Sequence, residues 1–368
     1  MASARKPLQP YCYSVYIVSR RAPDGHARQD CRFRSAKRSA FVARVLLAVI
    51  FTAGVHPGLA QKSAPPKHLG ILASAACPER LLPEMRLWPL LWSLADRGWV
   101  EGRTVIVDCI QAGGRMQDVP ALAAELVARK PDVLFGESTP VVRALKQATA
   151  KIPIVTIASD PLGSGIVTNL AHPEANVTGL APMSFELAAK RTELLRDVLP
   201  RLSRLALIYH TGADPVEHEQ MQKDIRSAGL ALGFTWKVFY LTSIADVGAT
   251  FEQLAAEGYD AVYIWPSPFA IFNTARIAAA ALQYRLPTIS DTTEFARFGV
   301  LLSYGVQDSS LLRAAAEYVD KLLRGAKPAD LPLQQPTKFE LVINLGTAKA
   351  LGLTIPQSVL LRTDEVIE

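Results

Sequence analysis

Polar or aromatic residues stand directly after several short apolar segments of this chain. They are Ser74, Ser138, Thr139, Ser159, Asp160, Trp265, Ser267, Asp291 and Tyr304. In an open parallel α/β sheet, ligands bind beyond the carboxyl ends of the strands. Hydroxyl and carboxylate groups at such ends can hydrogen-bond a small polar ligand, and an indole face can stack on it. If the apolar segments are strands, these residues are the candidate ligand-binding set.

Several candidates have a structural alternative. Pro140 suits the first turn of a helix, so Ser138 or Thr139 can cap that helix, although the free N–H groups at a helix start also bind anions. Asp160 precedes a proline and can cap a following helix. Asp291 can pair with a ligand ammonium group or cap the helix after it.

The remaining candidates are equally open. Ser74 can donate a hydrogen bond to a ligand or serve as a loop or cap serine. Trp265 and Ser267 flank a proline at a predicted strand end, where an indole keeps a stacking face that an interior tryptophan would bury. Tyr304 can face the ligand or pack against neighbouring side chains.

Motifs for catalysis and metal binding are missing. There is no GxGxxG after the first predicted strand, no Walker lysine loop and no HExxH, and the six histidines have no ligand spacing. The segment Gly136–Pro140 comes nearest to a nucleophile elbow but lacks the second glycine. We therefore predict no catalytic residue, no metal and no cofactor.

From His68 onward, short apolar segments that we predict as strands alternate with amphipathic helices, and these elements must position the candidate residues. This alternation is typical of parallel sheets covered on both faces. We also expect Ile152–Leu180 to run from a strand through a helix to a second short strand. The predicted strands are Leu69–Ala73, Thr104–Ile110, Asp132–Phe135, Ile154–Ala158, Leu205–Tyr209, Thr235–Tyr240, Ala261–Trp265, Pro287–Ser290, Val300–Ser303 and Leu341–Leu345. Ten strands exceed one compact sheet, so two lobes are expected.

The positive charge lies at the amino end. Residues 1–60 hold ten Lys or Arg against two Asp, a net charge of +8, so residues 61–368 carry −2 of the total +6. Nucleic-acid binding is therefore not expected of the main part. Basic residues precede the apolar run Val45–Val55, and Gly58 and Ala60 supply small residues before Gln61, as at a signal-peptide cleavage site. The run is about half the roughly 20 residues that span a bilayer, so a retained anchor is the weaker interpretation.

Two of the four cysteines remain after that cleavage. Cys77 follows the first predicted strand, and Cys109 lies near the end of the second. These positions are neighbours if the two strands pair, and an exported protein can form a disulfide there, although two unpaired cysteines are the alternative. No cysteine follows the cleavage point directly, so a lipid-anchored form is not supported.

Two blocks of the sequence resemble a known family. Ile152–Leu180 contains DPLGSGIV and NVTG, and Gln335–Gly352 reads QPTKFELVINLGTAKALG. Both are similar to blocks of bacterial ABC-transporter substrate-binding proteins of the TrpX-like family, over roughly residues 68–368. The resemblance implies a type I periplasmic-binding-protein fold, with two doubly wound parallel-sheet α/β lobes joined by a hinge of crossing strands. Residues 1–60 would be an N-terminal extension and signal peptide, 68–180 with about 305–335 lobe one, and 181–300 with about 340–368 lobe two.

The resemblance also implies a function. The chain would be a periplasmic monomer that captures a small polar ligand, an amino acid or related small acid, and delivers it to an ABC permease driven by a cytoplasmic ATPase. One departure concerns His210, which stands where relatives tend to have an N-P pattern, so contacts from this loop cannot be carried over. The alternative is a two-lobed α/β enzyme, such as a glycosyltransferase or epimerase. A regulator built on the same fold is less expected, because this chain has no helix-turn-helix before residue 68.

Overall fold

The computed structural model describes residues 65–74, 76–77, 87–173, 176–182, 187–211 and 215–368. All elements below belong to the unit Lys62–Glu368. The expected signal segment Val45–Val55 and the cleavage site before Gln61 lie outside the described residues. Within the described part, no helix is long and apolar enough to cross a membrane.

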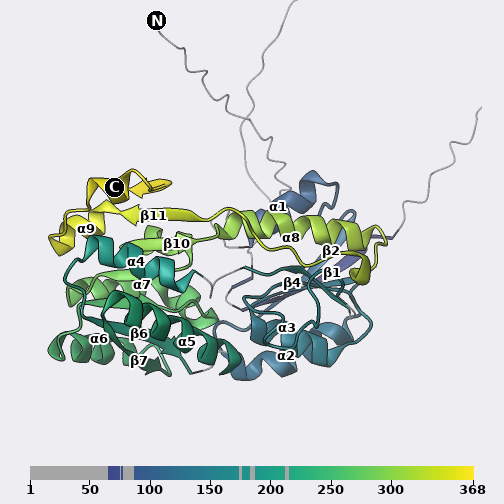
Figure 1. Cartoon of the computed structure of the whole chain (residues 1–368). Helices are drawn as coiled ribbons and strands as arrows, with labels where there is room; N and C mark the ends of the chain where they lie inside the picture. Colours follow the sequence, from purple (N-terminus) through teal and green to yellow (C-terminus); the bar gives the residue numbers. More distant parts are fainter. Residues whose placement is uncertain (1–64, 75, 78–86, 174–175, 183–186, 212–214) are drawn as a thin grey trace, which may run out of the picture. The chain divides into compact units, whose positions relative to one another are not determined.

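The first sheet has five parallel strands in the order β2-β1-β3-β4-β5. Alternate side chains of β1 point to opposite faces, so Leu69 and Ile71 pack with helices α1 and α8, whereas Leu72 packs with α2 and α3. Figure 1 shows these two helix pairs on opposite sides of the sheet. The strands are β1 Lys67–Ala73, β2 Val105–Gln111, β3 Val133–Glu137, β4 Ile154–Ile157 and β5 Val177–Leu180, and the helices are α1 Trp88–Asp96, η1 Met116–Asp118, α2 Val119–Ala128, α3 Thr139–Ala148 and α8 Asp308–Leu323.

The second sheet has seven strands in the order β12-β11-β10-β9-β8-β6-β7, parallel except for the antiparallel pair β10 and β11. Helices α4 and α5 pack on one face, and α6 and α7 pack on the other. The strands are β6 Arg204–His210, β7 Thr235–Leu241, β8 Ala261–Ile264, β9 Thr288–Ser290, β10 Leu302–Gly305, β11 Glu340–Asn344 and β12 Glu365–Ile367, and the helices are α4 Ala188–Val198, α5 Pro215–Leu232, α6 Asp246–Ala256, α7 Pro268–Gln283, η2 Thr293–Phe298, η3 Pro328–Asp330, α9 Leu345–Leu351 and α10 Gln357–Leu360.

These two sheets, each covered on both faces, confirm the expected α/β fold class. We call each sheet with its helices a lobe. The chain returns from β10 of the second lobe through residues 306–307 into α8, which packs on the first sheet. A further stretch crosses back after Leu331, where Gln334 bridges Leu180 before β11 begins. The crossings thus run beside the strand ends of both lobes.

Two sequence expectations are wrong. The segment between β4 and β5 forms turns where we expected a helix. Asp160 accepts a hydrogen bond from the Gly163 N–H at 2.7 Å, and Gly165 has a φ of 69°, which a right-handed helix cannot accommodate. The short strand Glu365–Ile367 was not anticipated, because three residues carry too little periodic pattern to be recognised.

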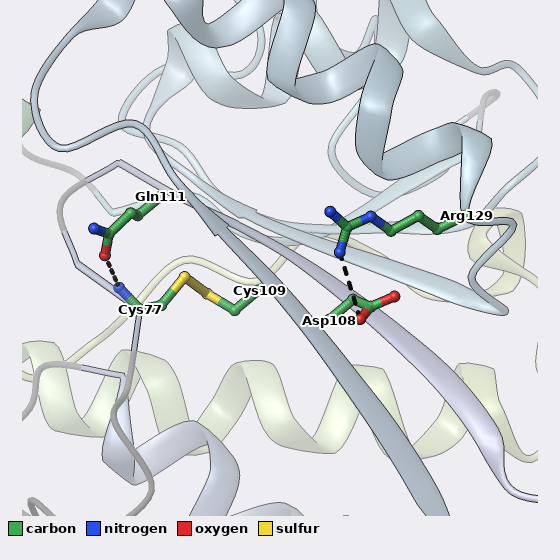
Figure 2. The surroundings of a disulfide bond; sticks show 5 residues. All are labelled: Cys77, Asp108, Cys109, Gln111 and Arg129. Carbon is green, nitrogen blue, oxygen red and sulfur yellow. Dashed lines mark hydrogen bonds and ion pairs between the residues drawn. A yellow bond between two sulfur atoms is a disulfide. The ribbon is translucent and has the colours of Figure 1, made fainter.

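A disulfide joins the segment after β1 to the end of β2. Cys77 and Cys109 are bonded, with Cα atoms 5.8 Å apart. The Gln111 side chain accepts a hydrogen bond from the Cys77 N–H at 3.0 Å, on the same side of β2 as Cys109, as Figure 2 shows. Asp108, the residue before Cys109 in β2, forms an ion pair with Arg129 at 3.5 Å (Figure 2). The disulfide and the amide contact together hold Cys77 at the end of β2.

Candidate functional site

A cavity lies where strand ends of both lobes meet. Its volume is about 100 Å³, which is more than a single water molecule needs. The predicted residues that line it are Ser74, Ser138, Thr139, Ser159, Ser267 and Asp291.

The first lobe contributes the ends of three strands. The Ser74 hydroxyl, after β1, donates to Glu137 Oε1 at the end of β3, at 2.9 Å, and both side chains are buried. Ser159 lines the cavity after β4. Because neighbouring parallel strands end at the same edge of a sheet, three segments far apart in the sequence supply one polar wall.

Ser138 lines the cavity and does not cap α3 with its side chain. It stands at the N-cap position of α3, but its side chain makes no capping hydrogen bond. Its Oγ is buried and has no hydrogen-bond partner among the described residues. Its backbone has a φ of 74° and a ψ of 145°, a region that residues other than glycine rarely adopt. The capping alternative thus does not describe Ser138, which lines the cavity at a helix start.

The second lobe contributes carboxylates and a helix cap. Ser267 Oγ accepts from the Ala270 N–H at 3.1 Å, so Ser267 caps α7 while it lines the cavity. Asp291 is 6% exposed after β9, and its Oδ1 accepts from the Thr292 hydroxyl at 3.1 Å. No side chain caps η2, the helix that follows, so Asp291 does not act as its cap.

One side-chain hydrogen bond joins the two lobes inside the cavity. The Thr139 hydroxyl, on α3 of the first lobe, donates to Glu217 Oε1, on α5 of the second. Both side chains are buried, and both line the cavity. This contact requires the lobes to approach each other, so it belongs to the arrangement in which the cavity is enclosed.

The charges that line the cavity are mostly negative. Among the described residues, the lining holds the carboxylates of Glu137, Glu217, Asp291 and Asp308 and the guanidinium of Arg191. No group of described side chains has the arrangement of a metal site. Buried carboxylates are stable only when cations or hydrogen-bond donors compensate them. Ser74, Thr139 and Thr292 each donate a hydrogen bond to one of these carboxylates.

Three predicted residues lie elsewhere. Asp160 closes a turn with Gly163 and is not part of the lining. The Trp265 side chain is 2% exposed and stacks at 6.1 Å on Tyr263 in the core of the second lobe. Tyr304 packs near Phe339, with ring centroids 6.4 Å apart, and its backbone carbonyl accepts from Arg191. Packing thus describes Trp265 and Tyr304, whereas Asp160 closes a turn and caps no helix.

Four charged lining residues, Glu137, Arg191, Glu217 and Asp308, were not predicted from the sequence. Glu137 sits beside Ser138 at a strand end, so the rule that found the serine should have found the glutamate. Glu217 and Arg191 lie within helices α5 and α4, where charged residues normally face solvent. No local pattern marks these two, because their burial depends on packing between distant segments.

The loop after β6 contributes no residue to the described lining. His210 stacks on Phe269, with ring centroids 4.3 Å apart and planes 9° from parallel. Burial lowers the pKa of the His210 imidazole, against a smaller opposing effect of its hydrogen bond with the Thr242 backbone. The neutral ring is thus favoured at this position, outside the cavity.

Two doubly wound lobes with a polar cavity at their facing strand ends define a two-lobed ligand-binding protein. The family model of ABC transporter substrate binding proteins matches residues 90–367, and the chain belongs to this family. The resemblance in the two sequence blocks is confirmed. The chain is therefore a substrate-binding protein of ABC transport and not an enzyme such as a glycosyltransferase or epimerase.

Individual relatives agree with this assignment. The chain is similar to a tyrosine-binding protein of Clostridioides difficile, with 24% identity over 262 residues, which cover 71% of this chain and 74% of the relative. A solved conserved domain protein of Vibrio cholerae has 27% identity and a TM-score of 0.74, covering 82% of this chain and all of the other. An ABC domain of Streptococcus pneumoniae in complex with L-Trp has 24% identity and a TM-score of 0.72 over 82% of this chain and all of the other, which shows the shared fold.

Proposed function

We propose that this protein captures an amino acid between its lobes and delivers it to an ABC permease. The proposal is supported by the named ligands of two relatives, tyrosine and L-Trp. It is also supported by a cavity that combines carboxylates for an ammonium group with a hydroxyl and a helix start for a carboxylate. These are the two charged groups that every free amino acid carries.

The polar groups suggest how the ligand is oriented. Its carboxylate would lie at the start of α3, where Ser138 Oγ has no partner among the described residues. Its ammonium group would lie toward Asp291, with Glu137 and Glu217 nearby in the lining. Charge-assisted hydrogen bonds contribute roughly 1.5 to 3 kcal/mol each, so three or four give about micromolar affinity after the entropic cost of association.

The rest of the lining would hold the ligand side chain. It is largely apolar and rich in prolines, whose rings are rigid and lose little entropy on packing. An aromatic side chain gains most from such a wall, since aromatic rings bury the most apolar area. The apolar residues concerned include Pro140, Ile157, Pro182, Pro266, Pro268 and Ile271.

The proposed cellular role follows from the family and from the amino end of the sequence. The segment Val45–Val55 would direct export, with cleavage before Gln61. The mature chain would then act in the periplasm as a monomer, and its ligand-bound form would dock on a membrane permease whose ATPase works in the cytoplasm. Its two lobes would be residues 68–180 with about 305–335 and residues 181–300 with about 340–368.

The unpartnered Ser138 hydroxyl beside a carboxylate-lined cavity carries the proposal, and calorimetry can test it. The twenty common amino acids are titrated into protein purified without refolding, and bound molecules are identified by native mass spectrometry. We expect L-tyrosine or L-tryptophan to bind with about micromolar affinity. Tyramine, which lacks the carboxylate, and 3-(4-hydroxyphenyl)propanoate, which lacks the amine, should each bind at least about tenfold more weakly than L-tyrosine. The proposal is refuted if none of the twenty amino acids binds. It is also refuted if L-tyrosine, tyramine and 3-(4-hydroxyphenyl)propanoate bind equally.

A further inference from the structure

A fully buried arginine lies where the cavity meets the connection between the lobes. Arg191 on α4 has 0% of its surface exposed. Its Nε donates to the Tyr304 carbonyl oxygen at 2.6 Å, and its Nη1 donates to the Tyr263 hydroxyl at 3.0 Å. A buried guanidinium is stable only when its donors are bonded and its charge is compensated. Neighbouring parts of the site must therefore supply those partners.

Asp291 provides a negative charge at the same place. Arg191 and Asp291 both line the cavity. Burial raises the pKa of the Tyr263 phenol to about 12, while the charge of Arg191 acts to lower it and that of Asp291 to raise it. Arg191 also bonds the Tyr263 hydroxyl, so a change at Arg191 reaches the side chain on which the Asp291 charge acts.

The backbone of Asp291 is in contact with the crossing between the lobes. A Cβ atom on Gly305 would lie 1.8 Å from the Asp291 carbonyl oxygen, so only glycine allows this approach. Gly305 ends β10, directly after the Tyr304 carbonyl that Arg191 holds. From β10 the chain enters α8, which packs on the first lobe. Arg191 thus contacts the strand that leads back to the first lobe.

We propose that Arg191 is a positioning residue that holds β10, and with it the end of β9 where Asp291 stands, in one arrangement, so that the preference of the cavity for a ligand ammonium group depends on it. This inference rests on the proposed function, because it assigns Asp291 the role of binding the amine. Arg191 acts through the Tyr304 carbonyl and the Tyr263 hydroxyl. The planar fork of a guanidinium can bond both partners at fixed angles, whereas the single ammonium of lysine cannot.

The test compares two arginines of the same helix. Arg196 on α4 also donates to main-chain carbonyls, those of Pro200 at 3.1 Å and Leu232, but it lies outside the cavity lining. Arg191→Met and Arg196→Met therefore lose similar bonds, and only the first loses a bond to β10, the strand that contacts the Asp291 backbone. The readout is the ratio of affinities for L-tyrosine and 3-(4-hydroxyphenyl)propanoate, which differ only in the amine.

We expect Arg191→Met to reduce this ratio by about tenfold, the effect of one lost charge-assisted bond, and Arg196→Met to leave it within about twofold of wild type. Amide hydrogen exchange without ligand should also become about tenfold faster near Asp291 and Tyr304 in Arg191→Met alone. If Arg191→Met does not fold, Arg191→Lys and Tyr263→Phe replace it in the test. Both variants should also reduce the ratio of the two affinities. An unchanged ratio together with unchanged exchange would overturn the inference, even if the protein melts earlier.

The two proposals fail in different ways. If wild-type protein binds no amino acid, the proposed function is wrong, and hydrogen exchange still decides whether Arg191 positions Asp291 and the crossing. If wild-type protein prefers L-tyrosine but Arg191→Met keeps that preference and its exchange rates, the function stands and the positioning role is wrong.

Discussion

Ser138 combines an unfavourable backbone with a hydroxyl that has no partner among the described residues. A non-glycine residue at a φ of 74° and a ψ of 145° costs roughly 1 to 3 kcal/mol of stability. Such strain persists where the surrounding structure enforces it, and it is concentrated at binding and catalytic sites. Here β3 ends one residue earlier and α3 begins one residue later, so Ser138 must make the whole change of direction.

Replacing Ser138 separates strain from binding. Ser138→Gly should stabilise the empty protein by about 1 kcal/mol, because relief of strain exceeds the added entropy of an unfolded glycine. It should also weaken binding of the ligand by about fivefold through loss of the hydroxyl. Ser138→Ala, the control, loses the hydroxyl but keeps the strain, so affinity falls and stability does not rise. Urea denaturation and calorimetry measure the two quantities, and unchanged affinity in both variants would remove Ser138 from the site.

Asp291 can be tested with little disturbance of its surroundings. Asp291→Asn keeps the shape and the acceptor for Thr292 but removes the charge. We expect ligand binding to weaken by about 1.5 to 3 kcal/mol, and the melting temperature to fall as well, because a negative charge is lost near the buried Arg191. Asp330→Asn, on the exposed turn η3, is the matched control and should change neither quantity. A lower melting temperature with full affinity would show that Asp291 only supports the fold.

Among the elements, β10 carries the closest backbone contact of the site. Because a Cβ on Gly305 would lie 1.8 Å from the Asp291 oxygen, Gly305→Ala must separate β10 from the end of β9. We expect a loss of about 3 kcal/mol in the free energy of unfolding, and weaker ligand binding. Gly248→Ala is the control, since Gly248 lies within α6 with open space around it and should stabilise by about 0.5 to 1 kcal/mol. Equal stability of the two variants would contradict the contact.

The disulfide stabilises the first sheet from its edge. Cys77 and Cys109 close a loop with a sequence separation of 32. On the chain-entropy model this corresponds to about 3 to 4 kcal/mol of stability. The double variant Cys77→Ser with Cys109→Ser should lose about that amount in urea denaturation, and reductant should affect wild type alone. Peptide mapping under non-reducing conditions should find the two linked, and two freely alkylated thiols in native protein would disprove the bond.

For the whole molecule, export decides where the cavity can meet its ligand. We expect amino-terminal sequencing of protein from the periplasmic fraction to begin at or near Gln61, because signal peptidase cleaves after small residues such as Gly58 and Ala60. Replacing Ala60 with a bulky residue should slow this cleavage. Full-length protein with its first 60 residues retained in the cytoplasm would contradict the proposed role in transport.

The sequence by itself determined the fold class and most strand positions. Apolar runs such as Leu205–Tyr209 mark buried parallel strands, and the observed strand Arg204–His210 differs by one residue at each end. Residues that follow such runs were correctly placed at the strand ends, because the end of a strand is a local property. The error between Asp160 and Gly165 was also local, since turn residues there outweigh helix periodicity.

Only the tertiary structure decided which side chains face the cavity. Trp265 and Tyr263 are two residues apart, so both point to one face of the sheet and into the core, while Ser267 after them reaches the cavity. Glu217 and Arg191 lie on helices, and their burial depends on partners such as Thr139 and Tyr304, which lie 78 and 113 residues away. Contacts over such separations leave no periodic pattern in the sequence, because they arise only when distant elements pack together.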